Sequence, residues 1–122
     1  MRVYLTIALT IFFTVVGQLL TKKGMAIAGT MPSGKGEVFL FLIKTMLLNP
    51  FVFGGLLMAV LAAMSWMMTL SRANLSFAYP FMSLAFPLVL ILSGIFFKEY
   101  ISFQRWIGLA IIMGGLFIVA RS

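Results

Sequence analysis

Long apolar runs separated by short polar links dominate the chain. Four of these runs carry at most one charge and are 18–23 residues long: Val3–Leu20, Phe51–Leu70, Leu75–Phe97 and Ile101–Ala120. A helix that crosses the hydrocarbon core of a bilayer needs about 20 apolar residues. Because lipid offers no partner to a free backbone N–H or C=O group, a spanning run must be helical.

The pattern therefore predicts an all-α integral membrane protein with a single four-helix domain over residues 1–122. The predicted spans are about 3–22, 50–71, 75–97 and 102–120.

The links between the runs differ in length. Only SRAN joins the second and third runs, and only KEYIS joins the third and fourth, so these helices must be antiparallel neighbours. The first link has turn residues at its centre, GTMPSGKG, followed by an apolar part at 37–48 that carries Glu37 and Lys44. Twelve residues are too few to cross a bilayer. This part is either a short helix at the membrane interface or a helical lead-in to the second span, and the sequence leaves both open.

Composition supports lipid as the solvent. Hydrophobic residues make up 63% of the chain and charged residues 9%, whereas soluble domains average about 45–50% and 25%. A domain of this size has too little interior to hide so much apolar surface. The net charge of +7 comes from Lys and Arg at the ends of apolar runs, which suits lipid headgroups and snorkelling better than nucleic acid.

The orientation in the membrane is weakly signalled. The side that holds the first and third links has six basic residues against three on the other side, which favours a cytoplasmic location for the first group. Lys22 and Lys23 belong to an extended first helix in an alternative interpretation. Without them the count is four against three and the bias almost disappears.

The chain has no Cys and no His, and its two acids, Glu37 and Glu99, lie outside the charge-free runs. Thiolate chemistry is excluded, and an acid–base enzyme or a metal site would be hard to build. We therefore predict no enzyme, no metal and no cofactor. The first run lacks the small-residue cleavage pattern of a signal peptide, so we expect a retained span.

Polar side chains recur along the first run at four-residue intervals: Thr6, Thr10, Thr14, Gln18 and Lys22. Residues i and i+4 are neighbours on a helix, so the row follows one face. For the threonines, bonding to their own helix carbonyls is favoured over a role as a cavity wall. An amide in lipid needs a partner, so Gln18 with Lys22 is favoured as part of a polar cavity.

The second run carries a similar polar face at its end. Ser65, Thr69 and Arg72 follow i, i+4, i+7 spacing, with Trp66 beside them. Helix packing is the simple alternative for Trp66. For Arg72, anchoring at the membrane interface is favoured over contact with a ligand.

The third run contains the segment FAYPFMSLAFP, with two prolines and two polar side chains. Each proline removes one helical hydrogen bond. Pro87 lies near mid-run and leaves the Ser83 carbonyl without its donor, whereas Pro80 lies near a helix start, where proline is tolerated. A free carbonyl in lipid costs several kcal/mol. We therefore expect the kink and the face shared by Tyr79 and Ser83 to meet protein or a hydrated cavity.

The fourth run has a strip of small residues, with Gly108, Gly114 and Gly115. Such strips let membrane helices approach closely, so packing within or between subunits is favoured over a ligand role.

Four segments in this order resemble the drug/metabolite transporter superfamily, with its EamA-like and small multidrug resistance-like members: VVGQLLTKKG, LSFAYPFMSL, the acid in FFKEYIS, and RWIGLAIIMGGLFIVA. They are most similar to the short four-helix members that flip aminoarabinose-phosphoundecaprenol, the lipid carrier used in lipid A modification. The resemblance covers the first span and the whole second half of the chain.

One departure from the family pattern bears on the substrate. The small multidrug resistance proteins carry a membrane-buried glutamate in the first helix, which binds protons and cationic drugs, and this sequence has Thr14 there. Proton-coupled export of cations by that carboxylate is not expected. Positive charge and neutral hydrogen-bonding groups suit an anionic headgroup, with Lys22 or Lys23 pairing its phosphate. The candidate substrate-binding residues are Thr14, Gln18, Lys22, Lys23, Ser65, Trp66, Tyr79 and Ser83.

The resemblance also implies a transporter in the bacterial inner membrane. The subunit would pair with a second copy or with a related four-helix chain and would move a lipid-linked or similar amphipathic substrate by alternating access. No nucleic-acid partner is expected. Two alternatives stay open: an exporter of neutral or anionic small molecules, and a non-transporting membrane subunit that scaffolds a glycosyltransferase.

Overall fold

The computed structural model describes residues 2–29 and 32–121, and within these ranges the chain is helical without a strand. The elements are α1 (Arg2–Ala28), α2 (Lys35–Leu48), α3 (Pro50–Leu70), α4 (Leu75–Phe81), the 3-10 turn η1 (Met82–Leu84), α5 (Ala85–Phe96) and α6 (Phe103–Arg121). Four helices of the described chain are long and apolar enough to cross a membrane: α1, α3, the combined α4–η1–α5 segment and α6. The all-α membrane fold is confirmed.

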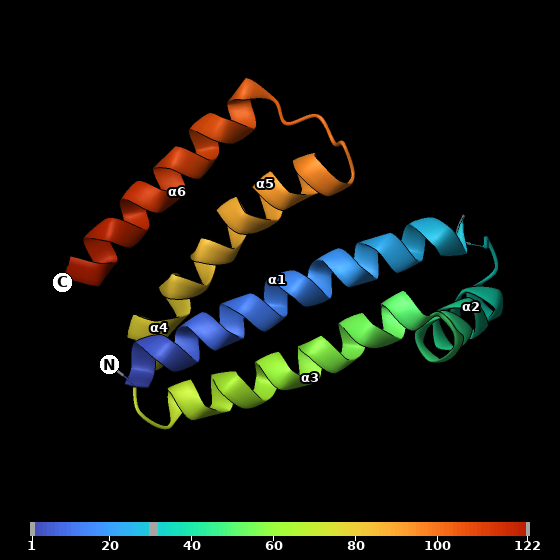
Figure 1. Cartoon of the computed structure of the whole chain (residues 1–122), viewed down its shortest axis with the longest axis horizontal. Helices are drawn as coiled ribbons and strands as arrows, with labels where there is room; N and C mark the ends of the chain where they lie inside the picture. Colours follow the sequence, from blue (N-terminus) through green and yellow to red (C-terminus); the bar gives the residue numbers. More distant parts are fainter. Residues whose placement is uncertain (1, 30–31, 122) are drawn as a thin grey trace.

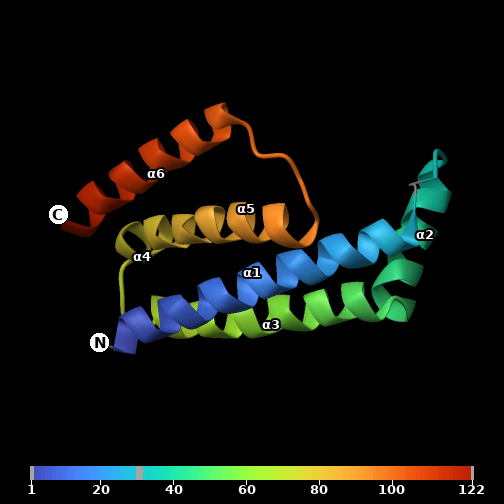
Figure 2. The same ribbon diagram turned by 45° about the horizontal axis from the view of Figure 1, so that its top comes forward.

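The spanning helices alternate in direction (Figure 1). α1 and α3 lie side by side and antiparallel, and the α4–η1–α5 segment returns next to α1. α6 runs back along the outside and meets the rest of the chain mainly through α4 and η1. Figure 2 shows the same order, with α6 standing apart from the α1–α3 pair.

Glycines bring α1 and α3 into close contact. A Cβ atom built on Gly55 would lie 2.9 Å from the Gly17 carbonyl oxygen and would collide with the Thr21 hydroxyl. A Cβ built on Gly24 would lie 2.8 Å from the backbone nitrogen of Val52. Only glycine allows two helix backbones to approach this closely. In lipid, where the hydrophobic effect does not drive helices together, such close packing supplies the van der Waals contact that holds them. The sequence pattern had not indicated a packing role for Gly24 or Gly55.

α2 is a separate helix and not a straight extension of α3. The break falls at Asn49, which is extended (φ −83°, ψ 116°) because the residue before a proline is driven out of the helical region. Its side chain caps α3, accepting from the N–H groups of Phe51 and Val52 at 3.0 and 3.4 Å. The Asn49 amide also donates to the Gly24 carbonyl at 2.9 Å, which ties the start of α3 to α1.

The third span changes its helix type between the two prolines. Residues Met82–Leu84 form a 3-10 turn between α4 and α5, with Pro80 before it and Pro87 after it. The Ala85 N–H donates to the carbonyls of Met82 and Ser83. The tight turn directs the Ala85 N–H toward the Ser83 carbonyl, the group that Pro87 leaves without its usual helical donor.

The interior of the chain lies between α1 and the third span. Its buried cluster is Ile7, Ile11, Val15, Ala78 and Ala85. α6 contributes little, with Leu116 as its only buried residue among those described. A Cβ built on Gly108, Gly114 or Gly115 would meet open space within this chain. Packing of these glycines inside the subunit is therefore not found, and only the expectation of packing between subunits stays open.

Candidate functional site

A partly open cleft of about 1120 Å³ runs between the four spanning segments. This volume is slightly above the roughly 300–1,000 Å³ of typical small-molecule sites. Each wall is one face of a helix. On α1 the lining residues include Thr10, Thr14 and Gln18, which follow the four-residue spacing seen in the sequence, and Gly17 and Thr21 beside them.

The opposite walls are mostly apolar. α3 contributes small residues such as Gly55 and Ala59 and ends its face at Trp66. The third span contributes Tyr79, Pro80 and Ser83 with larger apolar side chains, and α6 contributes Arg105, Gly108, Leu109 and Ile112. The cleft can therefore hold an amphipathic molecule with few but well-placed polar contacts.

An aromatic pair from two helices lies in the cleft wall. The rings of Trp66 and Tyr79 meet edge to face, with centroids 6.0 Å apart and an interplanar angle of 71°. Tyr79 is 64% exposed, so its phenol remains accessible. Aromatic faces and a free hydroxyl are what carbohydrate rings contact in protein sites, and this geometry offers both.

Charge enters the cleft at one point. Among the lining residues that the structure describes, Arg105 is the only one with a formal charge, and no carboxylate is present. The Arg105 Nη1 donates to the Tyr100 carbonyl at 3.3 Å. The sequence offered one signal for this residue: Arg105 is the one charge within the fourth apolar run.

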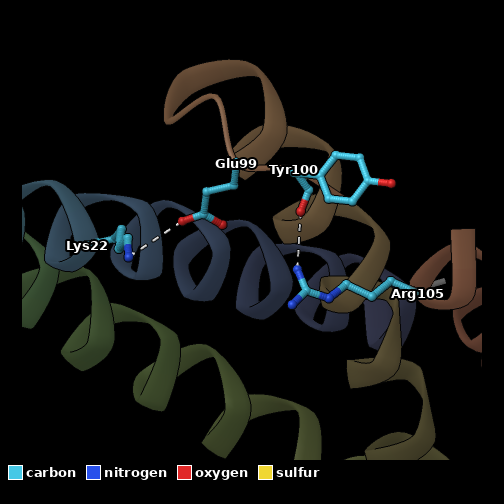
Figure 3. Close-up of polar contacts among 4 residues, drawn as sticks. All are labelled: Lys22, Glu99, Tyr100 and Arg105. Atoms are coloured by element: carbon cyan, nitrogen blue, oxygen red, sulfur yellow. Dashed lines mark hydrogen bonds and ion pairs between the residues drawn. The ribbon is translucent and has the colours of Figure 1, made fainter. Parts of the chain in front are cut away.

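The two lysines expected at the phosphate lie outside the lining of this cleft, as far as the described residues go. Lys22 Nζ is 3.5 Å from Glu99 Oε1, and both side chains are partly exposed (Figure 3). Lys23 Nζ lies over the Phe51 ring, 4.7 Å from its centroid. Both ammonium groups therefore already contact another side chain: Lys22 contacts Glu99, and Lys23 contacts Phe51.

The structure brings five of the eight candidate substrate-binding residues to the cleft: Thr14, Gln18, Trp66, Tyr79 and Ser83. Ser65 is buried, and its carbonyl accepts from the Thr69 hydroxyl at 3.1 Å. Of the two prolines, Pro80 is part of the cleft wall and Pro87 is not among its described lining residues. Gly108 lines the cleft, whereas Gly114 and Gly115 are exposed on α6.

Two threonines behave as the favoured interpretation of their row predicts. The Thr6 hydroxyl donates to the Val3 carbonyl and the Thr10 hydroxyl donates to the Thr6 carbonyl, each at 2.8 Å. Their polar atoms are thereby satisfied within α1. Among the described residues, no three His, Cys, Asp or Glu side chains come together.

No model of a known protein family matches the chain, and no solved structure matches it. Curated relatives do match over nearly their full length. The chain is 31% identical over 121 residues to the "Probable 4-amino-4-deoxy-L-arabinose-phosphoundecaprenol flippase subunit ArnE" of Hamiltonella defensa, covering 99% of this chain and 98% of the relative. It is 31% identical over 115 residues to the protein of the same name from Aeromonas salmonicida, covering 93% and 94%.

A relative with the second subunit name matches as well. The chain is 32% identical over 124 residues to the "Probable 4-amino-4-deoxy-L-arabinose-phosphoundecaprenol flippase subunit ArnF" of Proteus mirabilis, covering 97% of this chain and 91% of the relative. The resemblance seen in the sequence motifs is confirmed by these matches. With four membrane-crossing helices and full-length relatives of both kinds, the chain belongs to the ArnE/ArnF family of flippase subunits.

Proposed function

We propose that this chain is a flippase subunit that moves a polyprenyl-phosphate-linked aminosugar across the bacterial inner membrane. The names of the full-length relatives support this substrate class. The observation that carries the proposal is the cleft itself, which is largely apolar, has no carboxylate among its described lining residues and carries one cation. Such a cleft favours a headgroup that brings its own negative charge over a cationic drug.

The sugar would be held by neutral groups. Gln18 and Ser83 provide hydrogen-bonding groups from opposite walls, and Thr14 adds a hydroxyl. The Trp66–Tyr79 pair would stack against the sugar ring or its ammonium group, the second through cation–π attraction. The polyprenyl chain would lie against the apolar lining or in the surrounding lipid.

A second subunit would complete the site. α6 is the least covered span, with 6% of its most apolar stretch buried against 33% for α1. Its outer glycines, Gly114 and Gly115, leave room for a close neighbour. We propose a related four-helix chain as that neighbour, since relatives of this protein carry two different subunit names.

Transport would proceed by alternating access. Rocking of paired helices needs a place where a span can bend, and the 3-10 turn at Met82–Leu84 lies between two prolines in the cleft wall. The α1–α3 pair, fixed by its glycine contacts, would serve as the stationary wall.

Reconstitution tests the proposal. The chain is placed with its ArnF-type or ArnE-type partner in vesicles, and the crossing of a lipid-linked aminosugar is compared with uptake of a quaternary ammonium drug. We expect movement of the lipid and no drug uptake. Drug uptake without lipid movement would overturn the proposal.

The two glutamines of the chain form a matched pair of variants for this assay. Both are exposed, but Gln18 lines the cleft, whereas Gln104 lies at the start of α6 and is not among the described lining residues. Gln18→Ala should slow lipid movement by roughly tenfold, the effect of losing a hydrogen bond to the substrate. Gln104→Ala should leave the rate unchanged.

A further inference from the structure

Three charged side chains gather near the link between α5 and α6. Figure 3 shows the Glu99 carboxylate turned toward Lys22 and the Arg105 guanidinium reaching back to the link at Tyr100. The contacts are 3.5 Å from Lys22 Nζ to Glu99 Oε1 and 3.3 Å from Arg105 Nη1 to the Tyr100 carbonyl oxygen. Of the three, only Arg105 is among the described lining residues of the cleft.

The link is bent in a way that places Glu99 on the α1 side. Lys98 has φ 54°, in the left-handed region that few residues other than glycine adopt. This reverses the chain directly after α5 and precedes the acid. Glu99 thereby lies beside α1, where its carboxylate meets Lys22, which follows Thr14 and Gln18 at four-residue steps.

The charge of Arg105 is not neutralised by an acid in the described chain. Within the described residues its guanidinium contacts the Tyr100 carbonyl, which carries only a partial negative charge. A guanidinium has five donors in a planar fork that matches the oxygens of a phosphate, so most of its capacity remains for a ligand.

The Glu99 carboxylate could compete with a substrate phosphate for the Arg105 guanidinium. It is adjacent in the chain to Tyr100, whose carbonyl Arg105 already contacts. Lys22 binds the carboxylate from the opposite side. If the lysine charge were removed, the carboxylate would gain an ion pair by turning to the guanidinium. That pair would neutralise the one cation among the described lining residues of the cleft.

We infer that Arg105 binds the phosphate of the lipid-linked substrate and that Lys22 is a positioning residue, which holds Glu99 away from Arg105. The inference rests on the proposed function and names the residue that recognises the anion. It assigns the phosphate contact to α6 and not to Lys22 or Lys23, where the sequence had suggested it.

The experiment measures binding of undecaprenyl phosphate and of neutral undecaprenol to the reconstituted two-subunit protein. The readout is the ratio of the two affinities, because partial loss of folded protein lowers both and leaves the ratio unchanged. We expect Arg105→Gln to lower the preference for the phosphate by roughly tenfold. Arg105→Lys should retain part of it, and Arg72→Gln, which is not among the described lining residues of the cleft, should retain all of it.

The role of Lys22 is tested by a double variant. Lys22→Gln should lower the phosphate preference severalfold, because Glu99 is released to Arg105. Lys22→Gln with Glu99→Gln should restore it to the level of the unaltered protein. A double variant as weak as Lys22→Gln would mean that Lys22 contacts the phosphate itself, and the positioning role would be wrong.

Failure of the inference and failure of the proposed function give different results. An unaltered phosphate preference in Arg105→Gln, with flipping of the lipid-linked sugar by the unaltered protein, overturns the inference alone. Absence of both flipping and phosphate preference in the unaltered protein overturns the proposed function and the inference with it.

Discussion

The α1–α3 pair and α6 are membrane-crossing helices of similar hydropathy, yet they are held in opposite ways. Within the most apolar stretch of each helix, 33% of the residues are buried in α1, 22% in α3 and 6% in α6. Glycines of α1 and α3 meet backbone, whereas the glycines of α6 meet open space in this chain.

We therefore regard the α1–α3 pair as the stationary wall of the cleft and α6 as its adjustable wall. α1 and α3 pack through contacts that tolerate no extra atom and are joined by the Asn49–Gly24 hydrogen bond. α6 brings Arg105 and Gly108 to the cleft while its outer face stays uncovered. A helix with few contacts inside its subunit is free to move or to pair, and both are needed for the proposed transport.

The largest expected effect comes from adding a side chain between α1 and α3. Gly55→Val places two methyl groups against the Thr21 hydroxyl and the Gly17 carbonyl, and backbone at both sides prevents relief. Overpacking of a core costs about 1–3 kcal/mol, and here it should remove most of the folded protein. The measurements are the yield of monodisperse protein and its thermal unfolding.

Gly114→Val is the matched control, because a Cβ at Gly114 meets nothing in the chain. When the chain is expressed without a partner subunit, the folded yield of this variant should equal that of the unaltered protein. If the two variants behaved alike, the contrast between the two helices would be wrong.

A smaller effect is expected from the cap that joins α1 to α3. Asn49→Ala removes the acceptor for two N–H groups and the bond to the Gly24 carbonyl, and loss of a helix cap costs about 0.5–2 kcal/mol. The midpoint of unfolding in denaturant should fall accordingly. Asn74→Ala serves as the control, because the Asn74 side chain makes no cap bond to α4. An equal shift for both variants would contradict the assigned role.

The aromatic pair should affect transport at a modest level. Trp66→Ala removes the edge-to-face contact with Tyr79, and such pairs contribute about 0.5–1.5 kcal/mol, which corresponds to a two- to tenfold slower flipping rate. Trp106→Ala, on α6 and not among the described lining residues of the cleft, should leave the rate unchanged. If Trp106→Ala slowed flipping more than Trp66→Ala, the aromatic residue that contacts the substrate would lie on α6 and not on α3.

The smallest effect is expected at Lys23. Its contact with the Phe51 ring is an exposed cation–π interaction, for which about 0.5–1 kcal/mol is typical. Lys23→Gln should lower the unfolding midpoint slightly and leave flipping intact. If Lys23→Gln strongly slowed flipping without lowering the unfolding midpoint, Lys23 would be the residue that contacts the phosphate.

Hydropathy was enough to predict four spans, and the periodic row on α1 predicted Thr14 and Gln18 on the face that lines the cleft. These features are local, because length and spacing along one helix determine them. Gly55 went unassigned because a single glycine in an apolar run has many uses. Only the partner helix shows that its missing side chain is required.

The sequence by itself determined that the chain lies in lipid, that its spans carry no acid and that any substrate site must work through hydroxyls, amides, aromatics and cations. The tertiary structure alone decided which cation meets the cleft. Lys22 follows Gln18 by one helical step, yet Glu99 binds it from a distant link, and Arg105 enters from α6. Charge pairing depends on distance in space, and distance between residues on different helices is set by packing rather than by sequence separation.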